Sequence, residues 1–176
     1  MQSKYPLFDR ARLLIKPLAE RTHDLQASQW LEVDGPAPPF EHPQIRDVAA
    51  RIVAAERNGA ARILMMGAHL LRAGNNRLII DLLERGVLSA IAMNGAGAIH
   101  DYELARIGAT TESVARYVRT GEFGLWRETG ELNAWIAEAG RLGLGLGENV
   151  GRGMEESEYP YRELSVLAAA WRLDIP

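Results

Sequence analysis

The chain of 176 residues contains no cysteine. This absence excludes disulfide bonds, thiolate nucleophiles and cysteine-ligated metal sites. Lysine is nearly absent, because Lys4 and Lys16 are the only two in the sequence. The amino-terminal segment lacks the apolar core of a signal peptide, and no apolar run approaches the roughly 20 residues of a membrane-spanning helix. These absences favour a cytoplasmic protein without a membrane partner.

The charge balance argues against nucleic acid as a partner. A formal net charge of −3 and an isoelectric point near 5.8 provide no basic surface for phosphates or anionic lipids. With 47% hydrophobic and 24% charged residues, the composition is that of an ordinary globular protein. The length suffices for one substantial hydrophobic core.

The most informative segment, residues 62–103, predicts a β-α-β unit. Continuous apolar runs at 62–66 and 87–93 indicate buried strands, and the spacing of leucine and isoleucine at 74–85 indicates an amphipathic helix. Each strand ends in a turn of small residues, first Gly67–His69 and then Asn94–Gly97. Because the carboxyl ends of parallel strands share one edge of a sheet, the two turns should form a ligand crevice there.

The predicted fold class is α/β, a Rossmann-like parallel sheet flanked by helices on both faces. Another amphipathic helix begins at Pro43 and ends at Asn58-Gly59, and the last helix covers about 160–173. The apolar pair in residues 173–176 resembles the start of a third strand. The fold then looks incomplete at its C-terminus, to be completed by a partner or a longer chain; a frayed terminus is the alternative.

We expect two regions along the chain. Residues 1–40 form an N-terminal arm, with a short helix within 7–18 that Pro17 ends or kinks, and a stiff proline-rich connector at 34–39. Residues 41–176 form the N-terminal part of the Rossmann-like α/β domain.

The turn at Gly95-Ala96-Gly97 is half of a dinucleotide-binding fingerprint, with His100 in place of the third glycine. Glycines after a buried strand let backbone amides approach a ligand, and the following helix contributes its N-terminal dipole. The alternative is a tight turn without a ligand. A second glycine series, Gly143–Gly153, follows a predicted helix and indicates close helix packing or a mobile segment instead.

Two histidines, His69 and His100, fall at the predicted crevice and are candidates for acid, base or hydrogen-bonding roles. We expect no metal, because their only nearby companion is Asp101, itself a second catalytic candidate. Asp101 has an alternative role in serving the dipole of its helix. Asn94 is expected either to present its amide to a ligand or to stabilise the turn, and Arg72 to be a surface charge.

The segments Met66–Gly74 and Met93–Asp101 resemble the amino-terminal half of the deoxyhypusine synthases. In that family, a threonine-serine-asparagine turn and a glycine-rich turn followed by two glutamates and an aspartate occur at similar spacing. The resemblance covers about residues 40–176 and is most specific in 62–108. It implies a Rossmann-like fold, NAD bound at the interfaces of a homotetramer, and transfer of an aminobutyl group from spermidine.

The resemblance also implies site residues. Ala68 and His69 correspond to the serine-asparagine pair near the dinucleotide, His100 corresponds to a cofactor-side glutamate, and Asp101 matches the family's aspartate. The cofactor-binding residues expected from the turns and the resemblance together are Gly67, Ala68, His69, Asn94, Gly95, Ala96, Gly97 and His100.

The chain departs from the family in two respects. Ile99 and His100 replace the two glutamates, which removes negative charge expected to favour a cationic polyamine. The tryptophan-glycine-lysine motif that carries the family's covalent lysine is missing. Two main hypotheses therefore compete. The first is an NAD-dependent aminobutyl transferase, or a subunit or fragment of one, acting on a small amine as a homo-oligomer or with a complementary C-terminal half; the second is a non-catalytic nucleotide-binding or assembly module. A third alternative is a purely structural α/β domain whose glycine turns hold no ligand.

Overall fold

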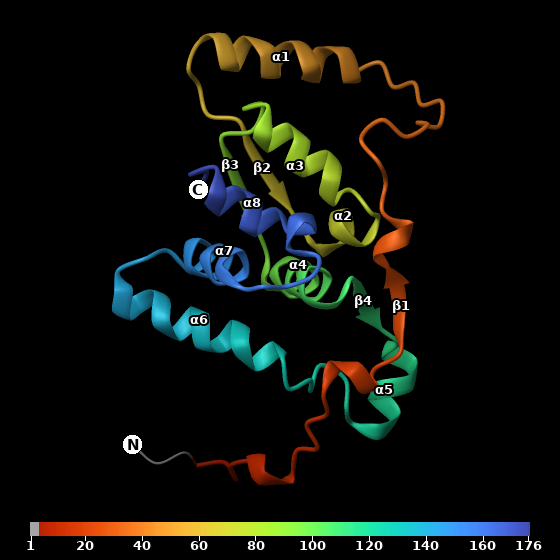
Figure 1. Cartoon of the computed structure of the whole chain (residues 1–176), viewed down its shortest axis with the longest axis vertical. Coiled ribbons are helices and arrows are strands. Elements are labelled where there is room, and N and C mark those ends of the chain that lie inside the picture. Colours follow the sequence, from red (N-terminus) through yellow and green to blue (C-terminus); the bar gives the residue numbers. More distant parts are fainter. Residues whose placement is uncertain (1–3) are drawn as a thin grey trace.

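The computed structural model describes residues 4–176 as a mixed α/β protein with short strands and many helices (Figure 1). The strands are β1 (His23–Gln26), β2 (Ile63–Met66), β3 (Ala90–Met93) and β4 (Ala109–Glu112). The α-helices are α1 (Ile45–Arg57), α2 (Ala68–Arg72), α3 (Asn76–Glu84), α4 (Gly95–Ile107), α5 (Val114–Thr120), α6 (Thr129–Leu142), α7 (Leu146–Glu156) and α8 (Val166–Arg172). Short 3₁₀ turns are η1 (Arg10–Arg12), η2 (Leu18–Glu20), η3 (Ala27–Gln29) and η4 (Arg162–Leu164).

The predicted β-α-β unit is confirmed. β2 and β3 pair in parallel, with Met66 opposite Met93, and α2 and α3 lie between them in the sequence. The second strand is shorter than predicted and begins at Ala90. The helix predicted at 74–85 forms as α3. A further short helix that was not predicted, α2, precedes it, and Gly74, with a φ of +81°, separates the two.

Only one face of the β2–β3 sheet is covered within the described residues. Leu64 and Met66 of β2, and the odd-numbered residues of β3, pack against a core built by α2, α3 and α8. On the opposite face Met65 is 80% exposed and Ile63 is 59% exposed. The prediction of helices on both faces is therefore wrong for residues 4–176, because the helices that contact the sheet all lie on the same side. α1 forms as predicted, but none of its residues is buried.

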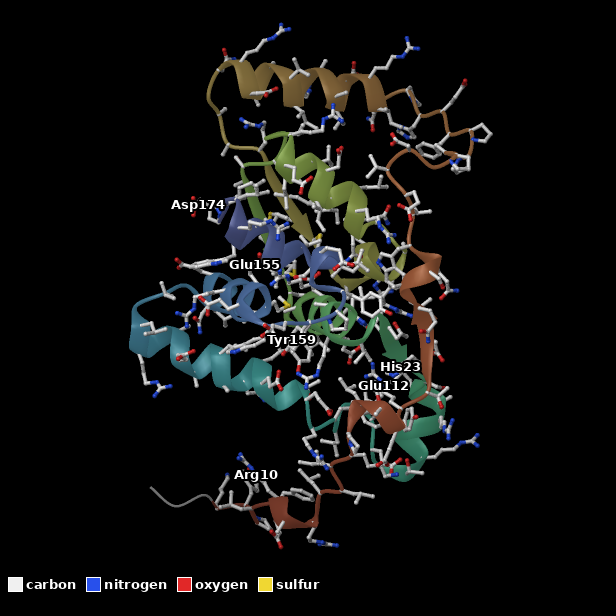
Figure 2. All side chains as sticks on the ribbon, in the orientation of Figure 1. Arg10, His23, Glu112, Glu155, Tyr159 and Asp174 are labelled. Carbon is white, nitrogen blue, oxygen red and sulfur yellow. The ribbon has the colours of Figure 1, made fainter. Side chains whose placement is uncertain are left out.

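A second sheet, which the sequence analysis did not predict, joins distant parts of the chain. β1 pairs antiparallel with β4, with His23 opposite Glu112 (Figure 2). The predicted helix within 7–18 is wrong, since only η1 and the start of η2 occur there, on either side of Pro17. Leu18 and Trp30 are buried, so part of the first forty residues belongs to the folded body. The boundary at residue 40 stays a prediction.

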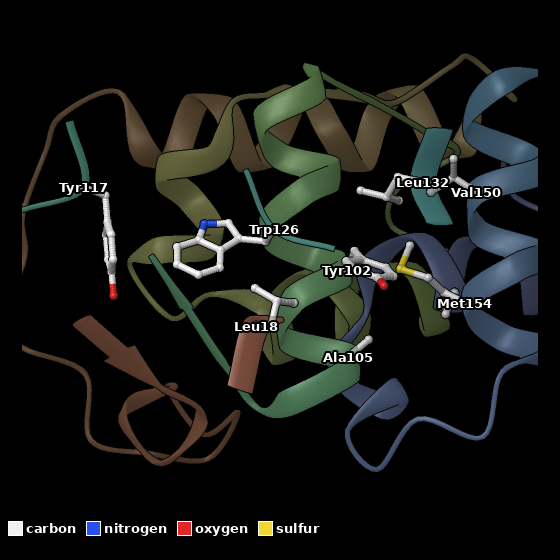
Figure 3. Packing of buried hydrophobic residues seen from close by; sticks show 9 residues of the cluster. Leu18, Tyr102, Ala105, Tyr117, Trp126, Leu132, Val150 and Met154 are labelled. Atoms are coloured by element: carbon white, nitrogen blue, oxygen red, sulfur yellow. The ribbon is translucent and has the colours of Figure 1, made fainter. Parts of the chain in front are cut away.

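The larger hydrophobic core surrounds α4, in which Asp101–Ala105 are all buried. Figure 3 shows Tyr102 beside Met154 in this core, with Leu18 and Trp126 on the side of the N-terminal segment. The core therefore joins α4 to α6, α7 and η2. This packing fixes the direction of the side chains on the remaining faces of α4.

The glycine series at 143–153 brings helices into close contact, which is the first of the two roles predicted for it. A Cβ at Gly151 would lie 2.5 Å from the carbonyl oxygen of Leu167 in α8, and a Cβ at Gly153 would overlap the indole of Trp135 in α6. The helices can pack this closely only because neither position carries a side chain larger than hydrogen.

The final residues return to the parallel sheet. The amide of Ile91 in β3 donates a hydrogen bond of 2.8 Å to the carbonyl oxygen of Pro176. Residues 173–176 thus run beside β3 at one point, although no strand is formed there. Among residues 4–176, no helix has the length and apolarity needed to cross a bilayer.

Candidate functional site

The two predicted turns lie side by side at the carboxyl ends of β2 and β3. Met66 and Met93 are partners in the sheet, so the turns begin at the same level. A Cβ built on Gly67 would be 3.6 Å from the side-chain nitrogen of Asn94. The prediction that the two turns lie next to each other is therefore confirmed.

The second turn leads directly into α4. Asn94 caps this helix, since its Oδ1 accepts a hydrogen bond of 2.9 Å from the amide of Gly97. Gly95 and Ala96 are exposed, and a Cβ on Gly95 would have no neighbour within 4 Å. Because the first amides of a helix have no intrahelical acceptor, those of Gly95 and Ala96 are available to an anionic group.

A cavity of about 1030 Å³ begins at this helix end and follows one face of α4. Gly95, Ala96, Ile99, His100 and Glu103 supply that face. The opposite wall is built by β4, α5, the loop before α6, and α6 and α7, with Arg72 of α2 and two residues from the N-terminal segment. The volume is at the upper end of the range typical for small-molecule and cofactor sites, about 300–1,000 Å³.

Several predicted cofactor residues lie outside this cavity. Gly67, Ala68 and His69 are not part of its wall; Ala68 is buried, whereas Gly67 and His69 are exposed beside it on the first turn. Gly97 is buried beneath the second turn, where a Cβ would meet the Met93 sulfur at 3.2 Å. Its lack of a side chain thus serves the packing of α4 on β3.

His100 is the predicted residue with the most developed surroundings. It is half-buried on the cavity wall, and its Nδ1 lies 2.6 Å from the Thr110 hydroxyl of β4. Burial is the main cause that lowers the pKa of His100, and the cations Arg72 and Arg21 lower it further. The imidazole is therefore neutral at pH 7.

Arg21 and Glu103 form a buried ion pair at the inner end of the cavity. The guanidinium Nη1 donates to Glu103 at 2.6 Å, and the two side chains are 1% and 2% exposed. Arg21 also lies over the Trp126 ring, 5.4 Å from its centroid. Its Nη2 is buried without a hydrogen-bond partner, which leaves one donor of the pair unsatisfied.

Arg72 is part of the site, although the sequence analysis assigned it to the surface. It lines the cavity, and its Nε donates to the Thr111 hydroxyl at 3.2 Å. Thr111 has a φ of +67°, an uncommon conformation for a β-branched residue. Strained residues of this kind concentrate at ligand-binding positions.

Asp101 does not face the cavity. Its carboxylate accepts hydrogen bonds from the hydroxyl of Ser165 and from the amides of Val166 and Leu167, at 2.7–2.9 Å, and so caps α8. The side chain is fully buried, and this burial raises its pKa to about 6. The position of Asp101 therefore does not support the catalytic prediction. It does not support the alternative either, in which Asp101 interacts with the dipole of its own helix, because its carboxylate caps α8 instead.

Sequence reasoning missed the carboxylates opposite α4 and the aromatic wall. Asp24 and Glu112 line the cavity together with Glu103. Glu112 accepts hydrogen bonds from the Trp126 indole and from the amide of Gly124, both below 3 Å. No local pattern marks these residues, because they reach the site only through the β1–β4 pairing and the loop after α5.

The described residues provide neither a metal site nor a lysine on the cavity wall. Within 4–176, no cluster of three histidine, cysteine, aspartate or glutamate side chains could hold a metal ion. Lys16 is not part of the cavity wall and forms an ion pair with Glu122, which raises the pKa of the lysine.

Comparison with known protein families and with curated protein sequences found no match for this chain.

Proposed function

We propose that this chain is the NAD-binding part of a deoxyhypusine synthase-like enzyme that transfers an aminobutyl group from a polyamine such as spermidine. One observation carries the proposal: two glycine-bearing turns lie side by side at the carboxyl ends of parallel strands, and a cofactor-sized cavity begins at the second. Ligands of α/β folds bind at this edge. The sequence resemblance supplies the identity of the cofactor and the reaction.

The residues present fit a dinucleotide. The amides of Gly95 and Ala96 at the start of α4 suit a pyrophosphate, and Arg72 lies on the wall of the same cavity. The apolar wall, which includes Met93, Phe123 and Trp126, suits planar rings. When bound, NAD would supply the acceptor for a hydride from the amine substrate.

The carboxylates of the cavity suit a cationic amine. Ile99 and His100 replace the family's two glutamates, but Asp24, Glu103 and Glu112 place negative charge on the same cavity. Glu103 is neutralised by Arg21, so Asp24 and Glu112 provide most of the attraction. The preference for an amine would thus come from carboxylates at other positions than the family's two glutamates.

The proposed enzyme needs a nucleophile from elsewhere. Lys16 is held by Glu122 outside the cavity, and Lys4, the other lysine of the sequence, is not part of the cavity wall either. In the proposed assembly another subunit of a homo-oligomer, or a complementary C-terminal half, supplies the lysine. The same observation favours the second candidate function, a non-catalytic nucleotide-binding or assembly module.

Binding of NAD to the assembled protein, with the other subunits or the complementary half supplied, tests the proposal. We expect NAD to slow hydrogen exchange in residues 67–74 and 94–100, and Gly95→Val to weaken NAD binding about tenfold or more, since its side chain would occupy the open space before α4. Gly130→Val is the matched control, because Gly130 is exposed in the first turn of α6, has open space around it and lies outside the cavity.

Two outcomes bear on the two candidates. Unchanged exchange at saturating NAD would refute the cofactor assignment. NAD binding without NADH formation from spermidine, measured by absorbance in the assembled protein, would favour the non-catalytic module.

A further inference from the structure

Four side chains, three of them within residues 100–110 and the fourth Arg21, form one continuous hydrogen-bonded chain at the cavity. His100 contacts Thr110 at 2.6 Å, the Thr110 hydroxyl donates to Glu103 at 2.6 Å, and Glu103 accepts from Arg21 at 2.6 Å. Thr110, Glu103 and Arg21 are buried, whereas His100 is half-buried on the cavity wall. The chain thus joins the buried ion pair at the inner end of the cavity to the half-buried imidazole on its wall.

The direction of these hydrogen bonds determines the tautomer of His100. Thr110 has one hydroxyl hydrogen, which it donates to the carboxylate of Glu103, and this carboxylate also accepts from Arg21. The Thr110 oxygen must then accept from His100, so Nδ1 carries the proton. Nε2 keeps a free lone pair, and among residues 4–176 it has no hydrogen-bond partner.

The charges around His100 favour this neutral form. Arg72 and His69 face it from α2, and Arg21 faces it from the segment before β1; all three oppose a proton on the imidazole. Glu103 of α4 itself acts in the opposite direction, but burial outweighs it and the pKa of His100 is lowered. At neutral pH Nε2 is therefore a vacant proton acceptor.

We propose that His100 accepts a proton through Nε2 from an amine bound in the cavity, and that Thr110, Glu103 and Arg21 are positioning residues that fix its tautomer and orientation. The amine N–H bond breaks, its electron pair stays on the nitrogen, and Nε2 gains the proton. Glu103, acting through the Thr110 hydroxyl, stabilises the resulting imidazolium. This inference rests on the proposed function for the choice of an amine, but the tautomer of His100 does not depend on it.

The tautomer is measured directly by ¹⁵N NMR of histidine-labelled protein. We expect His100 of the wild type to be neutral at pH 7 with the proton on Nδ1. Thr110→Val, which keeps the shape and removes the hydroxyl, should shift His100 towards the Nε2-protonated tautomer, and Thr110→Ser should restore the wild-type signal. A wild-type His100 protonated on Nε2, or a Thr110→Val variant with an unchanged signal, would overturn the inference.

The role in proton transfer is measured with spermidine as the probe. His100→Gln in the assembled protein should lower the rate of NADH formation at saturating NAD about 10²–10⁴-fold, the usual contribution of a general base. Thr110→Val should move the acidic limb of the pH profile, and Thr110→Ser should restore it. A His100→Gln variant with the wild-type rate would refute the proton acceptor.

The two proposals fail separately. NAD that does not bind, together with the predicted tautomer and its response to Thr110→Val, contradicts the proposed function and supports the positioning of His100. Bound NAD with the opposite tautomer refutes the positioning alone.

Discussion

At the residue scale, Asp101 illustrates how one side chain joins two helices. It projects from α4 and accepts two backbone amides and one hydroxyl at the start of α8. Because all these partners donate, an acceptor-only carboxylate satisfies them, and an amide would not. The desolvation that this burial imposes raises the pKa of Asp101 from its ordinary value of 3.8 to about 6.

Asp101→Asn should lower the free energy of unfolding by about 1–3 kcal/mol, since its amide group would face backbone donors. Asp101 binds a proton more tightly in the folded state than in the unfolded state. The stability that Asp101 gives the wild type, and with it the difference from Asp101→Asn, is therefore greatest below about pH 4 and declines as the pH rises to about 6. Urea denaturation of both proteins across this range measures the change.

Asp47→Asn on exposed α1 is the control for this prediction and should stay within about 0.5 kcal/mol of the wild type. A difference between wild type and Asp101→Asn that is independent of pH would contradict the assigned pKa.

At the element scale, the three helices α6, α7 and α8 pack through glycine. Gly151 and Gly153, on α7, contact the Leu167 carbonyl of α8 and the Trp135 ring of α6. The carbonyl belongs to backbone and the indole is rigid, so neither neighbour moves easily. The close contact of these helices in turn positions Val150 and Leu146 on the cavity wall.

Gly151→Ala should destabilise the fold by about 1–3 kcal/mol, because its Cβ would force α7 away from α8. Gly140→Ala on α6 is the matched control: its Cβ would meet nothing within 4 Å, and the higher helix propensity of alanine should stabilise the protein by up to about 1 kcal/mol. Thermal or chemical unfolding followed by circular dichroism compares the two. A stable Gly151→Ala variant would mean that the helices are farther apart.

At the scale of the whole molecule, residues 4–176 cover the parallel sheet on one side only. The face with Leu64 and Met66 packs on the helical core, and the face with Ile63 and Met65 is exposed. Parallel sheets are normally buried on both faces. The proposed homo-oligomer or complementary half would remove this exposure if it covers the same face.

Met65→Ala should change the free energy of unfolding of the dilute chain by less than about 0.5 kcal/mol, whereas Leu71→Ala in the covered core should cost about 2–5 kcal/mol. Denaturation at low protein concentration, with sedimentation to determine the oligomeric state, measures both. A large loss for Met65→Ala would show that this face is buried in the folded protein.

The sequence by itself determined the β-α-β unit, the two turns at its edge, α1 and the last helix. Each of these depends on local features: continuous apolar runs, helical spacing, and glycine or asparagine at turns. The turns were also predicted to meet, because parallel pairing of adjacent strands allows no other arrangement of their carboxyl ends.

Only the tertiary structure decided which side chains form the site. Arg21 meets Glu103 across 82 positions, and β1 brings the N-terminal segment to β4, so no window of sequence contains either contact. Asp101 and His100 are neighbours in sequence, yet helical geometry directs the first to α8 and the second to the cavity. Side-chain direction depends on the packing around the whole circumference of α4, and that packing comes from residues throughout the chain.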